Sequence, residues 1–150
     1  LKDNDILIYL DVNDKPLIGI REYLLHKFNK STSLNILTVG TNYPNIRHLS
    51  SFHKKNFSKE LLFSSFVHAQ PEAGFLAVRN NLTTRAILKA WYEFTFINYI
   101  ASENNILNRY DQETLFLLSR CYKSIKIESW LLYKLFGKGV RKYIKFEFLR

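Results

Sequence analysis

The sequence lacks methionine entirely and contains a single cysteine, Cys121, among its 150 residues. One cysteine cannot form a disulfide within the chain, and no cluster of Cys and His has the spacing of a zinc site. A complete translated chain starts with methionine, so its absence predicts that the original N-terminus has been lost by processing or truncation. The composition argues against a fold held together by disulfides or structural zinc.

Long apolar runs and a signal peptide are also missing. The longest apolar stretch, about residues 90–101, is interrupted by Glu93 and Asn98 and is too short to span a bilayer. Charged side chains stand close to Leu1, where a signal peptide needs an apolar run. We therefore expect a protein of the cytoplasm or of the periphery of a membrane surface.

The chain does contain the apolar residues that one packed domain needs. Hydrophobic residues make up 47% of it and aromatic residues 15%, which excludes a disordered chain. Its formal net charge is +9. A basic surface attracts nucleic acid, anionic lipid or phosphorylated small molecules, and the charge alone does not choose among them.

Strands alternate with helices along the sequence, a pattern typical of α/β folds. The spacing of apolar residues predicts strands over 6–10, 34–40 and 74–79 and helices over 17–28, 59–66, 84–99 and 111–121. The first strand, an apolar run that ends at Asp11, is expected to be buried. A long loop over 41–58 and a turn over 71–74, marked by proline and glycine, complete the pattern.

Polar residues gather at three points of this pattern. The points are Asp11, Asn13 and Asp14 after the first strand, the turn that contains Gln70 to Gly74, and Asp111 with Gln112 at a helix start. Magnesium- and manganese-type sites use one or two carboxylates together with phosphate oxygens. Taken alone, each point is better explained as a turn or as a helix cap, the role for which Asp111 is well placed.

The order of the three points resembles that of the GT-A glycosyltransferases, nucleotide-sugar-dependent enzymes with a single Rossmann-like domain. In that family a central strand ends in a D-x-D motif, and LDVND (10–14) is similar to it, with Asn13 in place of the second acid. EAGFLAVRN (72–80) and YDQETLFLL (110–118) are similar to two later motifs beside the donor sugar. A group of predicted bacterial glycosyltransferases, which also has a counterpart of NFSKELLF (56–63), is the most similar.

The resemblance covers about residues 3–122 and implies a Rossmann-like mixed sheet flanked by helices. It implies a nucleotide-sugar donor, a glycan or other hydroxyl acceptor, and a divalent cation, Mn²⁺ or Mg²⁺, on the diphosphate. The implied site consists of Asp11 with Asn13 or Asp14 on the metal, Gln70, Ala73 and Gly74 along the donor sugar with His68 nearby, and Asp111 with Gln112 as catalytic residues.

The resemblance also implies an incomplete domain, because the family's nucleoside-binding strands precede the D-x-D strand. We expect residues 1–129 to be the C-terminal part of a GT-A-like catalytic domain and residues 130–150 to be a basic aromatic segment. Basic and apolar residues interleave in that segment, a pattern typical of helices on anionic membrane surfaces. Gly137 and Gly139 disfavour a helix, so ordinary packing on the domain is an equal alternative.

A basic nucleic-acid-binding module without catalysis is the alternative from a different class. Net charge and aromatic content fit it. No recognised nucleic-acid-binding motif occurs, however, and the aromatic residues follow mainly buried periodicities. We therefore expect an enzyme without a nucleic-acid partner.

Overall fold

Four strands form the main sheet, in the order β1-β4-β3-β5. They are β1 (Ile6–Leu10), β3 (Ile36–Pro44), β4 (Ala69–Arg79) and β5 (Ile125–Glu128). β4 is antiparallel to β1 and β3, whereas β3 is parallel to β5. β1, β3 and β5 therefore run in one direction, and their carboxyl ends point to the same edge of the sheet. The computed structural model describes residues 2–11, 14–44, 49, 54–55, 58–101 and 110–146.

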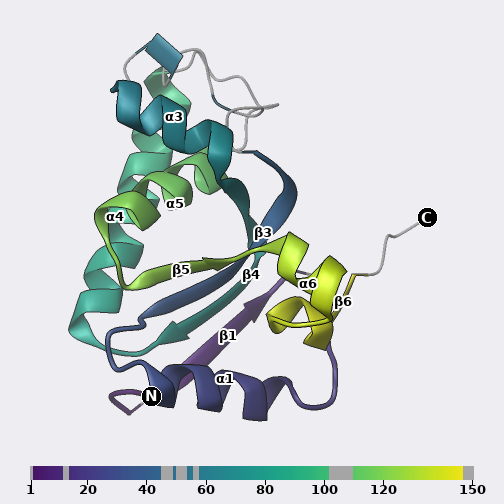
Figure 1. Cartoon of the computed structure of the whole chain (residues 1–150). Coiled ribbons are helices and arrows are strands. Elements are labelled where there is room, and N and C mark those ends of the chain that lie inside the picture. Colours follow the sequence, from purple (N-terminus) through teal and green to yellow (C-terminus); the bar gives the residue numbers. More distant parts are fainter. Residues whose placement is uncertain are drawn as a thin grey trace.

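Helices cover both faces of this sheet (Figure 1). The helices on the two faces are α1 (Ile20–Lys30), α4 (Leu82–Ala101) and α5 (Tyr110–Cys121), and α3 (Lys59–Val67) lies at one end of the sheet. Leu24 and Phe28 of α1 are buried in the core on one face, and Ile87 of α4 and Leu115 of α5 are buried in the core on the other. The expected mixed α/β fold, with a mixed sheet flanked by helices, is confirmed.

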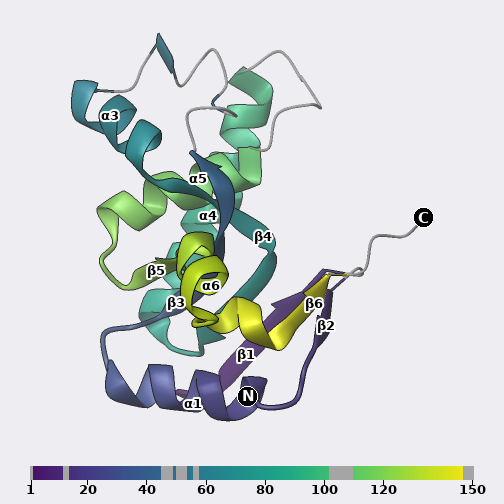
Figure 2. The same ribbon diagram turned by 45° about the vertical axis from the view of Figure 1, so that its right-hand side comes forward.

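The C-terminal segment returns to the α1 side of the sheet (Figure 2). It contains α6 (Trp130–Phe136), the 3-10 helix η2 (Val140–Tyr143) and β6 (Ile144–Phe146), which pairs antiparallel with β2 (Asp14–Pro16). Val140 and Ile144 are buried in the core beside α1. These two apolar residues are therefore packed on the domain instead of facing a membrane. In the described parts of the chain, no helix has the length and apolar character needed to cross a bilayer.

The prediction that the first strand is buried is wrong. β1 is an edge strand of the described sheet, and its Leu7, Ile8 and Tyr9 are 37%, 42% and 54% exposed. A continuous apolar run indicates a strand but does not show which neighbours will cover it. β5, with the alternating sequence IKIE, was not predicted because it is short and half of its residues are charged.

The predicted turn over 71–74 is also wrong, because β4 continues through it. Thr38 pairs with Leu76 but Val39 pairs with Glu72, so the residues between them, including Gly74, form a bulge. The Thr38 Oγ1 lies 2.7 Å from the carbonyl oxygen of Glu72 and 2.9 Å from that of Phe75, which holds the bulge in place. Proline and glycine favour turns and bulges alike, and bulges often lie beside functional sites.

Candidate functional site

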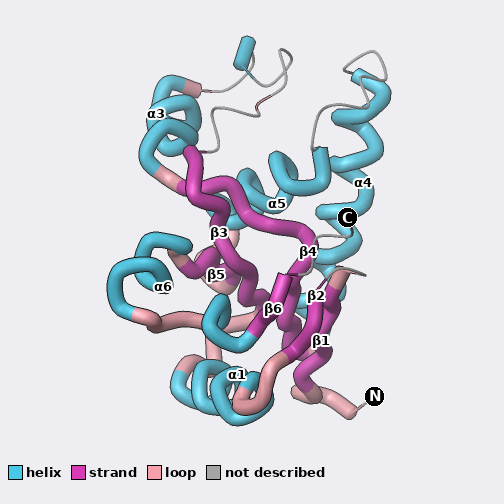
Figure 3. Tube along the Cα trace, turned by 90° about the vertical axis from the view of Figure 1, so that its right-hand side faces the viewer, coloured by secondary structure: helices cyan, strands magenta, loops and turns pink. Residues whose placement is uncertain are grey.

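The end of β1 brings Asp11 and Asp14 close to the segment that contains Gln70 to Gly74. β1 ends at Leu10, opposite Phe75, whereas β3 and β4 continue past it toward α3 (Figure 3). The backbone N–H of Asp11 donates a hydrogen bond to the Gly74 carbonyl (2.8 Å), and the N–H of Asp14 donates one to the Asp11 carbonyl (2.9 Å). The chain is thereby fixed where it leaves β1 and enters β2.

The carboxylates of Asp11 and Asp14 both approach Gly74. A Cβ atom placed on Gly74 would lie 3.1 Å from the Asp14 Oδ2, 3.4 Å from the Asp11 Cβ and 3.9 Å from the Asp11 Oδ2. The space beside the bulge is therefore shared by two acidic side chains. We call Asp11, Asp14, Glu72, Gly74 and Arg141 the acidic corner.

The charges in the acidic corner shift the pKa of Asp14 in opposite directions. Burial and the negative charge of Asp11 raise the pKa of Asp14, and the positive charge of Arg141 works in the opposite direction. Arg141, from η2, forms an ion pair with Glu72 of β4. Two carboxylates that repel each other are stabilised by any cation placed between them. The electrostatics of the acidic corner thus favour a bound positive charge.

The acidic corner fits a metal ion only if another group completes the coordination. Among the described residues, no three His, Cys, Asp or Glu side chains are grouped as a metal site. Asn13, the third predicted ligand, lies outside the described residues. Two carboxylates are what a magnesium-type ion takes from a protein when substrate phosphates supply further oxygens. Asp11 and Asp14 therefore supply two of the carboxylates that such an ion would need.

Gln70 lies on β4 beyond the acidic corner and is fully buried. It stands two positions before Glu72, in the stretch of β4 where the pairing with β3 shifts register. Neither the Gln70 Nε2 nor its Oε1 has a hydrogen-bond partner in the described parts of the protein. Because an unsatisfied buried amide is costly, this side chain is a candidate for contact with a bound ligand. Ala73 lies in the bulge, directly before Gly74.

His68 is placed away from the acidic corner. It ends α3 and lines a cavity of about 150 Å³ together with Arg120 and Ser129. Burial and the charge of Arg120 lower the pKa of His68. Since a strand rises about 3.3 Å per residue, His68 lies up to roughly 20 Å from Gly74 along β4. The structure does not bring this histidine to the two aspartates.

Asp111 and Gln112 belong to the helical layer on the other face of the sheet. α5 begins at Tyr110, so Asp111 lies within the first turn and the prediction that it caps the helix is wrong. The Trp91 Nε1–H donates a hydrogen bond to the Asp111 carbonyl (2.6 Å), and Asp111 borders an aromatic cavity of about 310 Å³ between α4 and α5. Gln112 is buried.

The first turn of α5 nevertheless points to the same edge of the sheet as Asp11. α5 is followed by a short turn and then by β5, so the helix runs opposite to the strand. Its N-terminal end, with Asp111 and Gln112, therefore lies toward the carboxyl ends of the parallel strands. Open α/β sheets bind their ligands at this edge.

Sequence reasoning missed Glu72 and Arg141 in the acidic corner and Glu128 at the end of β5. Glu72 belongs to the EAGFLAVRN motif. Its position two residues before Gly74 was the sequence feature that could have placed it at the site. Arg141 lies 69 positions from Glu72, so no local pattern could pair them. Glu128 is buried and lies 2.7 Å from the Tyr23 hydroxyl, 2.9 Å from the Lys27 Nζ and 2.7 Å from the Val140 N–H.

No protein-family model, curated protein or solved structure matches the chain.

Proposed function

We propose that the chain is part of a GT-A-like glycosyltransferase that moves a sugar from a nucleotide-diphosphate donor to a hydroxyl acceptor. The observation that carries this proposal is the approach of Asp11 and Asp14 to Gly74 at the carboxyl end of β1. Two carboxylates at this edge suit a divalent cation, Mn²⁺ or Mg²⁺, whose remaining ligands come from a diphosphate. When bound, such a cation neutralises negative charge on the leaving diphosphate.

In this proposal, the residues of the bulge, Gln70 and the first turn of α5 contact the donor sugar. The Ala73–Gly74 bulge leaves room beside the aspartates, because a larger residue than glycine would crowd them. The buried amide of Gln70 supplies a donor and an acceptor for sugar hydroxyls. Asp111 and Gln112 approach the donor from the α5 side, where a carboxylate stabilises positive charge that develops at the anomeric carbon.

The exposed edge of β1 supports the part of the proposal that concerns the nucleoside. Leu7, Ile8 and Tyr9 are exposed apolar side chains on a strand that pairs on one side with β4. Exposed apolar edge strands are normally covered, because their free backbone groups pair with other strands. In the proposed enzyme, the nucleoside-binding strands extend the sheet from this edge.

Substitution of Asp11 tests the proposal. Asp11→Asn is nearly isosteric, so we expect an unchanged melting temperature and Mn²⁺ affinity weaker by about tenfold or more. In the complete enzyme that the proposal implies, the same variant should lose Mn²⁺-dependent transfer from UDP- and GDP-sugars. Asp5→Asn, an exposed aspartate at the opposite end of β1, is the matched control. Equal Mn²⁺ affinity in wild type and Asp11→Asn, measured by electron paramagnetic resonance, would overturn the proposal.

Two further variants separate binding from turnover. In the complete enzyme, Asp111→Asn should lower kcat more than donor affinity, because its proposed role lies in the transition state. Asn13→Ala should weaken Mn²⁺ binding less than Asp11→Asn, because a neutral amide is a poor ligand for a hard cation.

The alternative, a nucleic-acid-binding module, has the net charge of +9 as its main support. Nucleic-acid binding would weaken steeply between low and moderate salt and would not need Mn²⁺. A titration with single-stranded RNA at two salt concentrations, with and without Mn²⁺, distinguishes the two functions.

An anionic membrane surface is proposed as a peripheral partner of α6. Leu131, Leu135 and Phe136 are 55%, 61% and 63% exposed, beside Lys134 and Lys138. Basic and apolar side chains together favour anionic lipid. Equal sedimentation of the protein with neutral and anionic vesicles would remove this partner.

A further inference from the structure

A separate pocket lies between the end of α1 and the start of β5, at the amino ends of β3 and β5. Its volume is about 430 Å³, and it is lined by Lys27, Lys30, Ser31, Ser33, Leu34, Lys123, Ile125 and Lys126. The acidic corner, in contrast, lies beyond the carboxyl end of β1. The two sites are therefore separate, and the proposed donor diphosphate does not account for this pocket.

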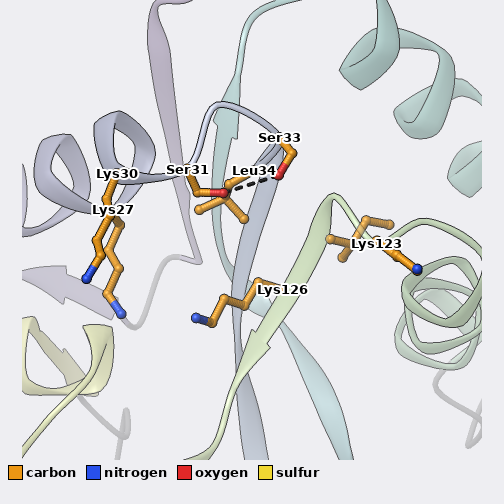
Figure 4. A pocket seen from close by; sticks show the side chains of 8 residues that line it. Lys27, Lys30, Ser31, Ser33, Leu34, Lys123 and Lys126 are labelled. Carbon is orange, nitrogen blue, oxygen red and sulfur yellow. Dashed lines mark hydrogen bonds between the residues drawn. The ribbon is translucent and has the colours of Figure 1, made fainter.

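Three ammonium groups in the pocket converge on one space. Figure 4 shows Lys27 and Lys30 side by side on α1 and Lys126, from β5, extended toward them, whereas Lys123 points away. Lys27 forms an ion pair with the buried Glu128 (2.9 Å). In the described parts of the chain, neither Lys30 nor Lys126 forms an ion pair. The space thus carries an excess of positive charge.

A further positive charge lies at the helix end behind the pocket. The carbonyl groups at the C-terminus of a helix normally repel anions. Here the Arg79 guanidinium donates hydrogen bonds to the carbonyl oxygens of Phe28 (2.6 Å), Ser31 (3.3 Å) and Leu34 (3.2 Å). Arg79 therefore satisfies these acceptors and adds a further positive charge beneath the pocket.

Hydroxyl groups complement the ammonium groups. The Ser31 and Ser33 Oγ atoms lie 3.3 Å apart at the rim, a long hydrogen bond that a stronger acceptor can replace. Buried Leu34 and Ile125 form the floor, and the volume falls in the range of small-molecule pockets. A strand of nucleic acid needs an extended groove, but a compact phosphate group fits a pocket of this size.

We propose that the pocket binds a compact phosphate-bearing group with two or more negative charges, held by Lys30, Lys126 and Lys27 and by the serine hydroxyls. The group is carried either by a soluble phosphate ester or by a phosphorylated lipid headgroup. Phosphate oxygens accept charge-assisted hydrogen bonds from lysine and ordinary ones from serine. The pocket is independent of the acidic corner and of the proposed sugar transfer.

The test is calorimetric titration of the 150-residue protein with inorganic pyrophosphate at low salt, in EDTA so that no metal-dependent site contributes. We expect wild type to bind and the double variant Lys30→Gln/Lys126→Gln to bind about tenfold more weakly or worse. Lys123→Gln, which lines the same pocket but points away, should change the affinity by less than about twofold. Melting temperatures of all variants show whether the fold is retained.

Vesicles distinguish the two sources of the phosphate group. Sedimentation with vesicles that contain phosphatidylinositol phosphates, lost in the double variant, identifies a lipid headgroup; pyrophosphate binding without such sedimentation identifies a soluble ester. The proposal is overturned if wild type does not bind pyrophosphate, if the folded double variant binds as wild type does, or if Lys123→Gln weakens binding as much as the double variant. The last result would indicate general surface charge, as in nonspecific binding of nucleic acid.

Discussion

Two buried carboxylates at the same edge of the sheet, Glu128 and Asp14, have opposite environments. Glu128 receives hydrogen bonds from Tyr23, Lys27 and the Val140 backbone. Burial alone would raise its pKa, but these donors outweigh burial and hold the pKa below its ordinary value. Asp14 stands beside Asp11, and burial together with that negative charge raises its pKa despite Arg141.

The difference separates a carboxylate that holds the scaffold together from one that the proposed function places on a cation. The charge of Glu128 is fully compensated within the protein, and the residue joins α1, β5 and η2. The charge of Asp14 is undercompensated, so a bound cation gains from interaction with it. Carboxylates with perturbed pKa values cluster at functional sites, where the pKa is matched to the task of the group.

Removal of Glu128 should have the largest effect on stability. Glu128→Ala leaves Tyr23, Lys27 and the Val140 N–H without their shared acceptor, and breaking a buried ion pair of this kind costs about 3 kcal/mol. For a chain of this size that corresponds to a melting temperature lower by roughly 10 °C. Glu93→Ala, which removes the exposed ion pair with Lys89 (3.8 Å), is the control and should cost under about 0.5 kcal/mol.

The effect of Glu128 should also depend on pH. A lowered pKa in the folded state means that the ionised form is stabilising above the ordinary glutamate pKa of 4.5 and that this contribution is lost as pH falls. The difference in the free energy of unfolding between wild type and Glu128→Ala should therefore become smaller below pH 4.5. A gap of constant size down to pH 3 would show that Glu128 acts through packing, and the contrast with Asp14 would fail.

Asp14→Asn should have a smaller effect on stability and one of the opposite sign. Because the pKa of Asp14 is raised in the folded state, its ionisation at neutral pH is destabilising, and this penalty is lost as pH falls from the raised pKa to the ordinary aspartate value of 3.8. The variant should melt at a higher temperature than wild type at pH 7, yet bind Mn²⁺ about tenfold more weakly. A lower melting temperature at pH 7 would assign Asp14 to the scaffold.

The sequence predicted local features of this contrast but not its cause. The run ILIYL predicted β1, and the polar residues after it placed candidate ligands at the carboxyl end of a strand. The bulge at Gly74 depends on Thr38 of another strand, and the ion pair of Arg141 with Glu72 depends on the docking of η2. Long-range contacts of this kind decide whether a carboxylate is compensated, so single-sequence patterns could not separate Asp14 from Glu128.

Gly74→Ala should have the smallest effect on stability while still affecting the acidic corner. Replacing glycine with alanine stabilises a compatible position by about 0.4–1 kcal/mol through the unfolded chain. The new Cβ would press on the Asp14 Oδ2 at 3.1 Å, but a carboxylate at the end of a side chain can move aside. We expect a net change of under about 1 kcal/mol, with weaker Mn²⁺ binding because the two carboxylates are forced apart.

Gly40→Ala is the matched control for Gly74→Ala. In the neighbouring strand, a Cβ on Gly40 would lie 2.9 Å from the Ala69 Cβ and 3.2 Å from the Ile127 Cγ2, so crowding there should lower stability and leave Mn²⁺ affinity unchanged. If Gly74 acts through Asp14, the double variant Gly74→Ala/Asp14→Asn should bind Mn²⁺ no more weakly than Asp14→Asn alone, because contacting residues are not additive. Additive losses would mean that Gly74 leaves room for something other than the two aspartates.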